Sequence, residues 1–339
     1  MKKIVHFIPY DGIGGVESAA RSMGCLMKGD VDFKSDFIYR NASNTNYLAT
    51  YNPFPLFAAV QKVAFNSVDL LIVSLWRAYI VGILAKLFKP KLKLIVFIHV
   101  QKDVHWLDYL FSRLAIFLAT EVWADSKASL RLRFPRLNPD KCRVISFVTH
   151  HFKALPMKAV SPDFIFWGRM SLQKNIDRSL RIFGDVYRHI PTARFWIIGP
   201  DGGELSALKR LCNTLELSDS VVFLGEMNFD EIIQYAQQAS FYLQTSEFEG
   251  MAMSVVEAMQ LGLVPVVTPV GEIGSYCKHG QNALVVESDN QCVDDLFDLL
   301  GNDNNFQTMS LEAINTWTEK PLYAESVMRA CESILSLQC

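Results

Sequence analysis

Short runs of apolar, β-prone residues alternate with helical patterns along almost the whole chain, and this alternation constrains the fold most. Parallel strands need a crossover between them, usually a helix, so the pattern is typical of parallel α/β sheets. The first half predicts strands at Lys3–Ile8, Phe33–Tyr39, Leu70–Ser74, Leu94–His99, Glu121–Ala124 and Arg143–Phe147. The second half predicts strands at Asp163–Trp167, Arg194–Ile198, Val221–Leu224, Phe241–Gln244, Val264–Thr268 and Ala283–Val286. Predicted helices include Val16–Met27, Trp106–Leu118, Ile176–His189, Leu205–Leu215, Phe229–Gln238 and Ser254–Leu261.

Each half repeats the same plan, and 339 residues are enough for two domains. The periodicity lapses near residues 151–161, where Pro156 stands and Pro162 follows. We therefore predict doubly wound α/β domains over residues 1–155 and 156–320, and a helix within residues 321–339 that packs back on the first domain. Because open α/β sheets bind ligands beyond the carboxyl ends of their strands, we expect a cleft between the two domains.

Composition narrows the class of protein. Half of the residues are apolar and 20% are charged, which excludes a disordered chain. The most apolar stretch, residues 70–88, is interrupted by Arg77 and Lys86, so no membrane-spanning helix is predicted. The seven cysteines are scattered without a Cys-x-x-Cys pair, and the histidines lack metal-ligand spacing. These features predict reduced thiols in a cytoplasmic protein without a metal site.

Charge is divided unevenly between the halves. Residues 1–155 carry 21 Lys and Arg against 11 Asp and Glu, whereas residues 156–339 carry 12 against 24. A basic first half suits an anionic partner, such as anionic lipid, a phosphorylated acceptor or nucleic acid. No nucleic-acid-binding signature accompanies the charge, so nucleic acid is not predicted. A solvated basic face without any partner is the alternative.

Two carboxylates, Glu249 and Glu257, lie eight residues apart around the start of a predicted helix. Glu249 lies in the loop that precedes the helix, and Glu257 lies within the helix. Gly250 lets the backbone approach a ligand closely, and the free N–H groups of a helix start favour a phosphate. The spacing alone leaves two interpretations open. The pair binds the hydroxyl groups of a sugar and a ribose, or it only stabilises a helix N-terminus.

Residues 246–259 resemble the Glu-x7-Glu motif of the retaining GT-B glycosyltransferases often called family 4, or glycosyltransferase group 1. Residues 262–267 resemble the small-residue turn and strand that follow in that family, and residues 280–285 resemble a later turn leading to a strand. The resemblance covers nearly the whole chain and is most specific over residues 164–286. It implies two facing Rossmann-like domains with an inter-domain cleft.

Strand-end segments of the second half carry the same resemblance. Gly168 and Arg169, followed by Lys174, resemble an element that the family places after the first strand of this domain. Residues 197–203 resemble its strand-plus-glycine loop, and residues 222–227 resemble the strand end that meets the nucleobase. The resemblance implies that Arg169 and Lys174 hold a diphosphate. The residues implied to bind the nucleotide sugar are Gly168, Gly199, Gly225, Glu226, Met227, Gly250, Met251, Ala252, Met253, Ser254 and Glu257.

The first half contributes a glycine loop and a histidine. Residues 11–17 follow the first strand and open a helix, but Glu17 stands where a dinucleotide fingerprint has its third glycine. The loop resembles the family's first loop, which implies that Gly14 and Gly15 line the acceptor side. His99 ends a strand and matches a family histidine beside the donor sugar.

The resemblance implies transfer of a hexosyl unit, with retention of configuration, from a nucleotide-diphosphate sugar. A UDP-sugar is favoured over a GDP-sugar, and the acceptor is a glycan or lipid-linked glycan of surface-polysaccharide, O-antigen or lipopolysaccharide biosynthesis. Arg169, Lys174, Glu249 and His99 are the implied catalytic residues, with no metal and no cofactor besides the nucleotide sugar. The basic half suggests docking on the anionic inner face of the cytoplasmic membrane. Two alternatives stay open: a sugar-nucleotide epimerase of GT-B-like fold, and a non-catalytic glycan-binding protein.

Overall fold

The chain forms two compact units in a computed structural model that describes residues 1–12, 15–23, 25–28, 30–39, 52–99 and 102–336. One unit is Met1–Thr149 with Pro321–Cys339, and the other is His150–Lys320. The division falls six residues before the expected boundary at 155/156. The reason is that the connecting segment binds the second unit: Leu155 N donates to Leu261 O at 3.0 Å.

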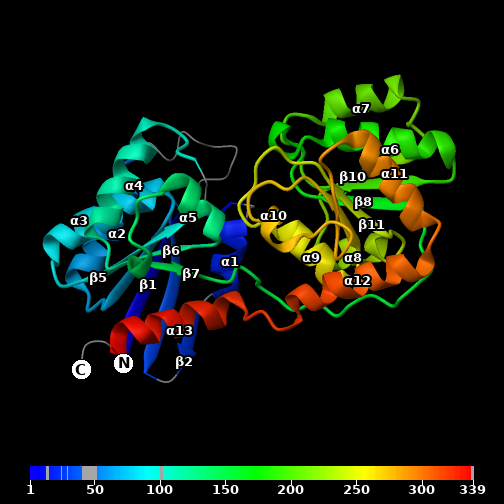
Figure 1. Cartoon of the computed structure of the whole chain (residues 1–339). Coiled ribbons are helices and arrows are strands. Elements are labelled where there is room, and N and C mark those ends of the chain that lie inside the picture. The colour runs from blue at the N-terminus through cyan, green and yellow to red at the C-terminus, as the bar shows by residue number, and fades with distance from the viewer. Residues whose placement is uncertain (13–14, 24, 29, 40–51, 100–101, 337–339) are drawn as a thin grey trace. The chain divides into compact units, whose positions relative to one another are not determined.

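The first unit is built around a mostly parallel sheet (Figure 1). Within its described residues the sheet has seven strands in the order β2-β3-β1-β4-β5-β6-β7. The strands are β1 (Lys2–Tyr10), β2 (Cys25–Lys28), β3 (Val31–Tyr39), β4 (Leu70–Ser74), β5 (Lys93–Ile98), β6 (Glu121–Ala124) and β7 (Cys142–Val144). The helices are α1 (Gly15–Met23), α2 (Phe54–Phe65), α3 (Trp76–Phe88), α4 (Trp106–Leu118), α5 (Lys127–Arg133) and α13 (Tyr323–Ser336).

The second unit repeats the plan with a fully parallel sheet. Its strands run in the order β10-β9-β8-β11-β12-β13, which makes six in the part of the chain described. They are β8 (Asp163–Trp167), β9 (Arg194–Ile198), β10 (Val221–Gly225), β11 (Phe241–Gln244), β12 (Val264–Val267) and β13 (Leu284–Val285). The helices are α6 (Ile176–His189), α7 (Leu205–Thr214), α8 (Phe229–Ala236), α9 (Met253–Leu261), α10 (Ile273–Tyr276), α11 (Asp289–Leu300) and α12 (Asp303–Thr318). The two sheets confirm the predicted α/β class.

One predicted helix is partly wrong. Residues 16–27 were expected to be helical throughout, but α1 ends at Met23 and Cys25–Lys28 form β2. This strand pairs antiparallel with β3, with Leu26 opposite Phe33. Leu and Met are good helix formers locally, so the pairing with β3 overrides their intrinsic preference.

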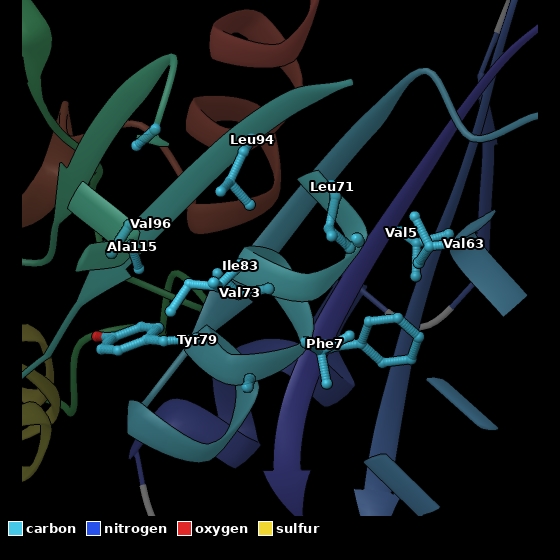
Figure 2. Packing of buried hydrophobic residues seen from close by; sticks show 14 of the residues in the cluster. Val5, Phe7, Val63, Leu71, Val73, Tyr79, Ile83, Leu94, Val96 and Ala115 are labelled. Carbon is cyan, nitrogen blue, oxygen red and sulfur yellow. The ribbon is translucent and has the colours of Figure 1, made fainter. Parts of the chain in front are cut away.

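The centre of the first unit is an apolar core between the sheet and the helices α2, α3 and α4. Every residue of β4 is buried, as expected for a parallel strand covered on both faces. Figure 2 shows side chains from β1, β4 and β5 meeting side chains from the helices. The labelled residues are Val5, Phe7, Val63, Leu71, Val73, Tyr79, Ile83, Leu94, Val96 and Ala115.

Helix α13 belongs to the first unit although it ends the sequence (Figure 1). Tyr323 N donates to Val148 O at 2.6 Å, and the Tyr323 ring lies edge-on to Phe147 with 5.3 Å between centroids. Tyr323 is fully buried by these contacts. None of the described helices combines the length and the apolar character needed to cross a membrane.

Candidate functional site

Three glycines follow one another across the carboxyl edge of the second sheet. Gly168, Gly199 and Gly225 lie at the ends of the neighbouring strands β8, β9 and β10. Gly168 N donates to Ile198 O at 2.9 Å, and Gly199 N donates to Gly225 O at 2.7 Å. Gly199 has φ 140, and a Cβ on it would lie only 2.0 Å from Gly168 O. Only glycine therefore fits at this crossing of two backbones.

The loop that carries Arg169 is fastened to the loop after β9. Met170 N donates to Pro200 O at 3.0 Å, and Gly202 N donates to Met170 O at 2.8 Å. A Cβ on Gly202 would lie 2.9 Å from Arg169 Cγ, so the arginine stem crosses that backbone. Arg169 is exposed at this sheet edge.

Lys174 ends a 3-10 helix, Leu172–Lys174, directly before α6. Asn175 follows it in the left-handed conformation (φ 47), and Thr245 Oγ1 donates to Asn175 O at 2.7 Å. This geometry directs the lysine toward the loop after β11. Lys174 Nζ lies 2.8 Å from Glu249 Oε1, and the two side chains are 15% and 8% exposed.

Glu249 is held through one of its two oxygens. Its Oε1 accepts hydrogen bonds from Lys174 Nζ, from Ser246 Oγ at 2.8 Å and from Gln244 Nε2 at 3.3 Å. No described residue donates a hydrogen bond to the second oxygen of this carboxylate, Oε2. Three donors on one oxygen fix the orientation of the carboxylate and leave the second oxygen able to accept from a ligand.

The backbone from Gly250 to Ala252 is braced from the α10 region. Glu272 N donates to Gly250 O at 3.1 Å, and Tyr276 OH donates to Met251 O at 2.8 Å. Ala252 adopts the left-handed conformation (φ 56) at the start of α9. The first N–H groups of α9, those of Met253 and Ser254, have no partner within the helix and form a positive helix end suited to a phosphate.

Glu257 lies half-buried within α9, where Trp167 Nε1 donates to its Oε2 at 2.8 Å. Burial raises the pKa of this carboxyl from 4.5 to about 7, although the Trp167 hydrogen bond and the charge of Lys174 act in the opposite direction. Trp167 O accepts from Tyr242 OH at 3.1 Å, and Tyr242 in turn bonds Gln244, which joins the second carboxylate to the Lys174–Glu249 pair. One cation and two carboxylates thus form a single cluster beside a helix N-terminus.

A buried polar network supports this cluster from the sheet side. Tyr242 OH lies 2.8 Å from Gln244 Oε1, and Ser254 Oγ donates to the same oxygen at 3.0 Å. The amide group of Gln244 then reaches Glu249. The polar residues of this network were not predicted, apart from Ser254. Gln244 ends its strand at the carboxyl edge, and that placement was the signal available in the sequence.

The predicted nucleobase residues lie apart from the cluster. Glu226 and Met227 follow β10, at the edge of the sheet, and β9 and β8 separate that strand from β11. Glu226 is exposed and Met227 is half-buried. The next helix, α8, begins with a capping box in which Asn228 Oδ1 accepts from Glu231 N at 3.0 Å.

His99 lies in the first unit, directly after β5, and is buried. Its Nε2 lies 2.9 Å from Ser74 Oγ, and the same hydroxyl lies 2.8 Å from His6 Nε2. Its Nδ1 faces Asp125 Oδ2 at 3.7 Å, which is too long for a hydrogen bond. Both ring nitrogens therefore point at side chains of the unit, whereas the family resemblance implies a sugar beside this ring.

The glycine loop of the first unit is described only in part. Gly14 lies outside the described residues, and Gly15 is the exposed first residue of α1. Across the described residues no group of three or more His, Cys, Asp or Glu side chains is arranged to hold a metal ion.

A family model of known proteins matches most of the second unit. Residues 148–313 match the family model described as Glycosyl transferases group 1. The matched range contains Arg169, Lys174, Glu249 and Glu257, and the strand-end glycines.

Two curated relatives match over part of the chain. Alpha-monoglucosyldiacylglycerol synthase of Acholeplasma laidlawii is 27% identical over 171 residues, which are 50% of this chain and 42% of the relative. The phosphatidylinositol N-acetylglucosaminyltransferase gpi3 subunit of Schizosaccharomyces pombe is 30% identical over 142 residues, which are 40% of this chain and 31% of the relative. The matches therefore span less than half the length of these relatives.

Among solved structures, HepE of Anabaena in complex with UDP is similar over almost the whole chain. The TM-score is 0.80 at 17% identity, with 99% of this chain and 100% of that chain covered. At this identity the likeness establishes the fold. The chain thus has the GT-B fold, and its residues 148–313 are similar to the Glycosyl transferases group 1 family.

Proposed function

We propose that this chain is a retaining glycosyltransferase of family 4 that moves a hexosyl unit from a nucleotide-diphosphate sugar to a glycan or lipid-linked acceptor. The observation that carries the proposal is the cluster of Lys174, Glu249 and Glu257 at the start of α9, within the segment matched by the group 1 model. A cation, a positive helix end and two hydroxyl-binding carboxylates suit the three parts of such a donor: diphosphate, sugar and ribose.

In this proposal Arg169 and Lys174 neutralise the charge that develops on the leaving diphosphate, so that no metal ion is required. The free Oε2 of Glu249 and the amides from Gly250 to Met253 bind the donor sugar. Glu257 accepts hydrogen bonds from the ribose hydroxyls. The bond from the anomeric carbon to the diphosphate oxygen breaks, the acceptor oxygen attacks from the same face, and its proton passes to the leaving phosphate.

The remaining proposed roles belong to residues at or after the ends of strands. Gly168, Gly199 and Gly225 allow the backbone to approach the nucleotide, and the backbone at Glu226 and Met227 meets the base. Gly14 and Gly15 serve the acceptor side. His99 needs a change of its present contacts to reach a sugar, because both ring nitrogens face Ser74 and Asp125.

A UDP-sugar donor and a lipid-linked acceptor are the favoured substrates. Support for UDP comes from the solved HepE complex, which holds this nucleotide. Support for a lipid comes from the names of the two relatives, which contain diacylglycerol and phosphatidylinositol. We place the reaction in surface-polysaccharide, O-antigen or lipopolysaccharide assembly at the anionic inner face of the cytoplasmic membrane, because the first 155 residues carry an excess of ten positive charges.

The test is a thermal-shift screen with UDP-, GDP- and other nucleotide sugars, followed by NMR of the product formed with the best donor. A ligand that binds only the folded state raises the melting temperature, so a UDP-sugar is expected to raise it most. The product is expected to keep the anomeric configuration of the donor. A protein that no nucleotide sugar stabilises contradicts the proposal, and consumption of donor without acceptor identifies an epimerase or hydrolase instead.

A further inference from the structure

Helix α4 exposes large apolar side chains on the side that faces away from the core. Its buried side carries Asp108 and Ser112 together with Ala115 and Ile116, whereas its exposed side carries Trp106, Leu110 and Phe117. Trp106 and Phe117 are 72% and 80% exposed. Surface helices normally turn such residues inward, so this side of α4 is shaped for an apolar environment.

Helix α2 shows the same property. Ala59, Val60 and Val63 face the core, while Phe54 and Phe65 on the other side are 77% and 86% exposed. Apolar residues thus occupy both sides of the helix, although only one side is covered by the unit. A helix that is apolar all round belongs in a buried or lipid-facing position.

Helix α3 packs against both α2 and α4 and joins them into one layer. At its end Phe88 is 70% exposed. Lys89, the next residue, donates through Nζ to Asn66 O at 2.9 Å and to Val68 O at 3.3 Å, which ties this end to the end of α2. Phe65 and Phe88 are therefore held at neighbouring helix ends.

The charges of this layer have one sign on the outside. Asp108 is the only acidic residue of α2, α3 and α4, and it is buried against Arg133, with 2.6 Å between Oδ1 and Nη2. The loop after α3 adds Lys89 and the exposed Lys91, and Lys93 begins β5. The layer therefore presents aromatic and aliphatic side chains bordered by cations, without an exposed carboxylate.

We infer that the outer face of α2, α3 and α4 is a membrane-docking surface that lies on an anionic bilayer leaflet, with Phe65, Phe88 and Phe117 inserted at the headgroup–acyl boundary. Aromatic residues favour this boundary, and lysines beside it gain from anionic headgroups. Insertion of these side chains adds a hydrophobic contribution to the membrane binding of the proposed function, and salt does not screen that contribution. Membrane docking concerns the first unit alone and does not require the transfer reaction.

A bilayer accounts for this surface better than a protein partner does. The exposed apolar residues spread over three helices, and Lys89, Lys91 and Lys93 lie in the segment that directly follows α3. A soluble partner would need a matching acidic rim around an equally broad apolar face. An anionic leaflet supplies negative charge and an apolar phase at every point of its surface, because apolar chains lie directly under charged headgroups.

The test is co-sedimentation of the full chain with vesicles of phosphatidylcholine alone and with about one-third phosphatidylglycerol added. The variant combines Phe65→Ser, Phe88→Ser and Phe117→Ser, and the matched control is Leu311→Ser, an exposed apolar residue on α12 of the second unit. Wild type and control are expected to sediment with the anionic vesicles and to keep part of that binding in high salt. Each phenylalanine is expected to contribute on the order of tenfold to the partition coefficient.

Three outcomes overturn the inference. The triple variant sediments as the wild type does, the wild type fails to sediment, or the wild type is a dimer by light scattering that the triple variant splits without any change in vesicle binding. The last outcome identifies the face as a contact between two copies. Melting temperatures of all variants are measured in parallel, with and without nucleotide sugar. Loss of vesicle binding and loss of donor binding are thereby read separately.

Discussion

Lys174 Nζ lies 2.8 Å from Oε1 of Glu249, across 75 residues of sequence. The same oxygen accepts from Ser246 and Gln244, so a buried carboxylate is held by one charged and two neutral donors. Hydrogen bonds that involve an ionised group are the strongest of the kind, and they hold the lysine where it also acts on Glu257. The pair thus links the 3-10 helix before α6 to the loop before α9.

Replacing Lys174 by Ala is expected to lower kcat on the order of 100-fold, because the leaving group loses a cation that acts in the transition state. The measurement is turnover of the best donor identified by thermal shift, with folding checked by the melting temperature. Lys209→Ala, an exposed lysine on α7, is the matched control and should retain full turnover. Turnover of Lys174→Ala equal to that of the control would remove Lys174 from the proposed mechanism.

The raised pKa of Glu257 predicts that the stability of the protein depends on pH. Its pKa is about 7 in the native state, against 4.5 for a free carboxyl, so the native protein holds a proton that the unfolded chain releases. The contribution of this group to stability is present below pH 4.5 and is lost as pH rises toward 7. Glutamine at position 257 does not titrate. The melting temperature of Glu257→Gln should therefore increase relative to that of the wild type as the pH rises from 4.5 to about 7. Parallel curves for the two proteins would contradict the assignment.

The same group predicts a pH-dependent affinity for the donor. A charged carboxylate accepts from two ribose hydroxyls, whereas a protonated one is a poorer acceptor. The KM for the donor in the wild type should therefore fall as pH rises through about 7. In Glu257→Gln the KM should be about tenfold higher and independent of pH. An unchanged KM in this variant would show that Glu257 does not bind the nucleotide.

Because the backbones of Gly168 and Gly199 cross closely, a methyl group added at Gly199 is expected to destabilise the protein. In Gly199→Ala the new Cβ would fall 2.0 Å from Gly168 O, so the strand ends must separate, at a cost above about 2 kcal/mol. Gly225→Ala is the control, because its φ is 74 but nothing lies within 4 Å of the new Cβ. It should cost about 1 kcal/mol. Urea unfolding measures both, and equal losses would refute the steric argument.

The hydrogen-bond contacts of Ser74 predict that this residue stabilises the first unit. Its hydroxyl lies within hydrogen-bond distance of both His6 and His99, and burial lowers the pKa of His6 to about 3, with help from His99. A hydroxyl has one proton, so one ring donates to Ser74 while the other accepts from it. Ser74→Ala would leave two buried ring nitrogens unpaired, at a cost of about 2–3 kcal/mol.

The control for this variant is Ser112→Ala. Ser112 is equally buried, but its hydroxyl donates to Tyr109 O at 3.1 Å and accepts from Arg113 Nη1 at 3.3 Å, both within its own helix. Its loss should cost about 0.5 kcal/mol. Chemical denaturation gives both values. A Ser74→Ala protein as stable as Ser112→Ala would mean that the histidines find other partners.

Local sequence predicted the elements well where one signal dominated. The run Leu70–Ser74 is a strand with the expected bounds, because its apolar residues can be buried on both faces of a parallel sheet. The bounds of α4 and α6 were also as predicted. The strand β2 was missed because no local pattern shows that Cys25–Lys28 pair with β3. The first unit ends six residues before the expected boundary, and Phe152 N, just beyond that end, donates to Gln260 Oε1, over a hundred residues away in the sequence.

The amino-acid sequence by itself determined the alternation of strands and helices, and the glycines and carboxylates at strand ends, because these depend on neighbours along the chain. Only the tertiary structure decided that Lys174 meets Glu249, that Trp167 binds Glu257, and that burial shifts the Glu257 pKa. The packing of strands β8 and β11 side by side brings these distant residues together. A hydrogen bond needs two atoms within about 3 Å, and separation in sequence does not specify that distance.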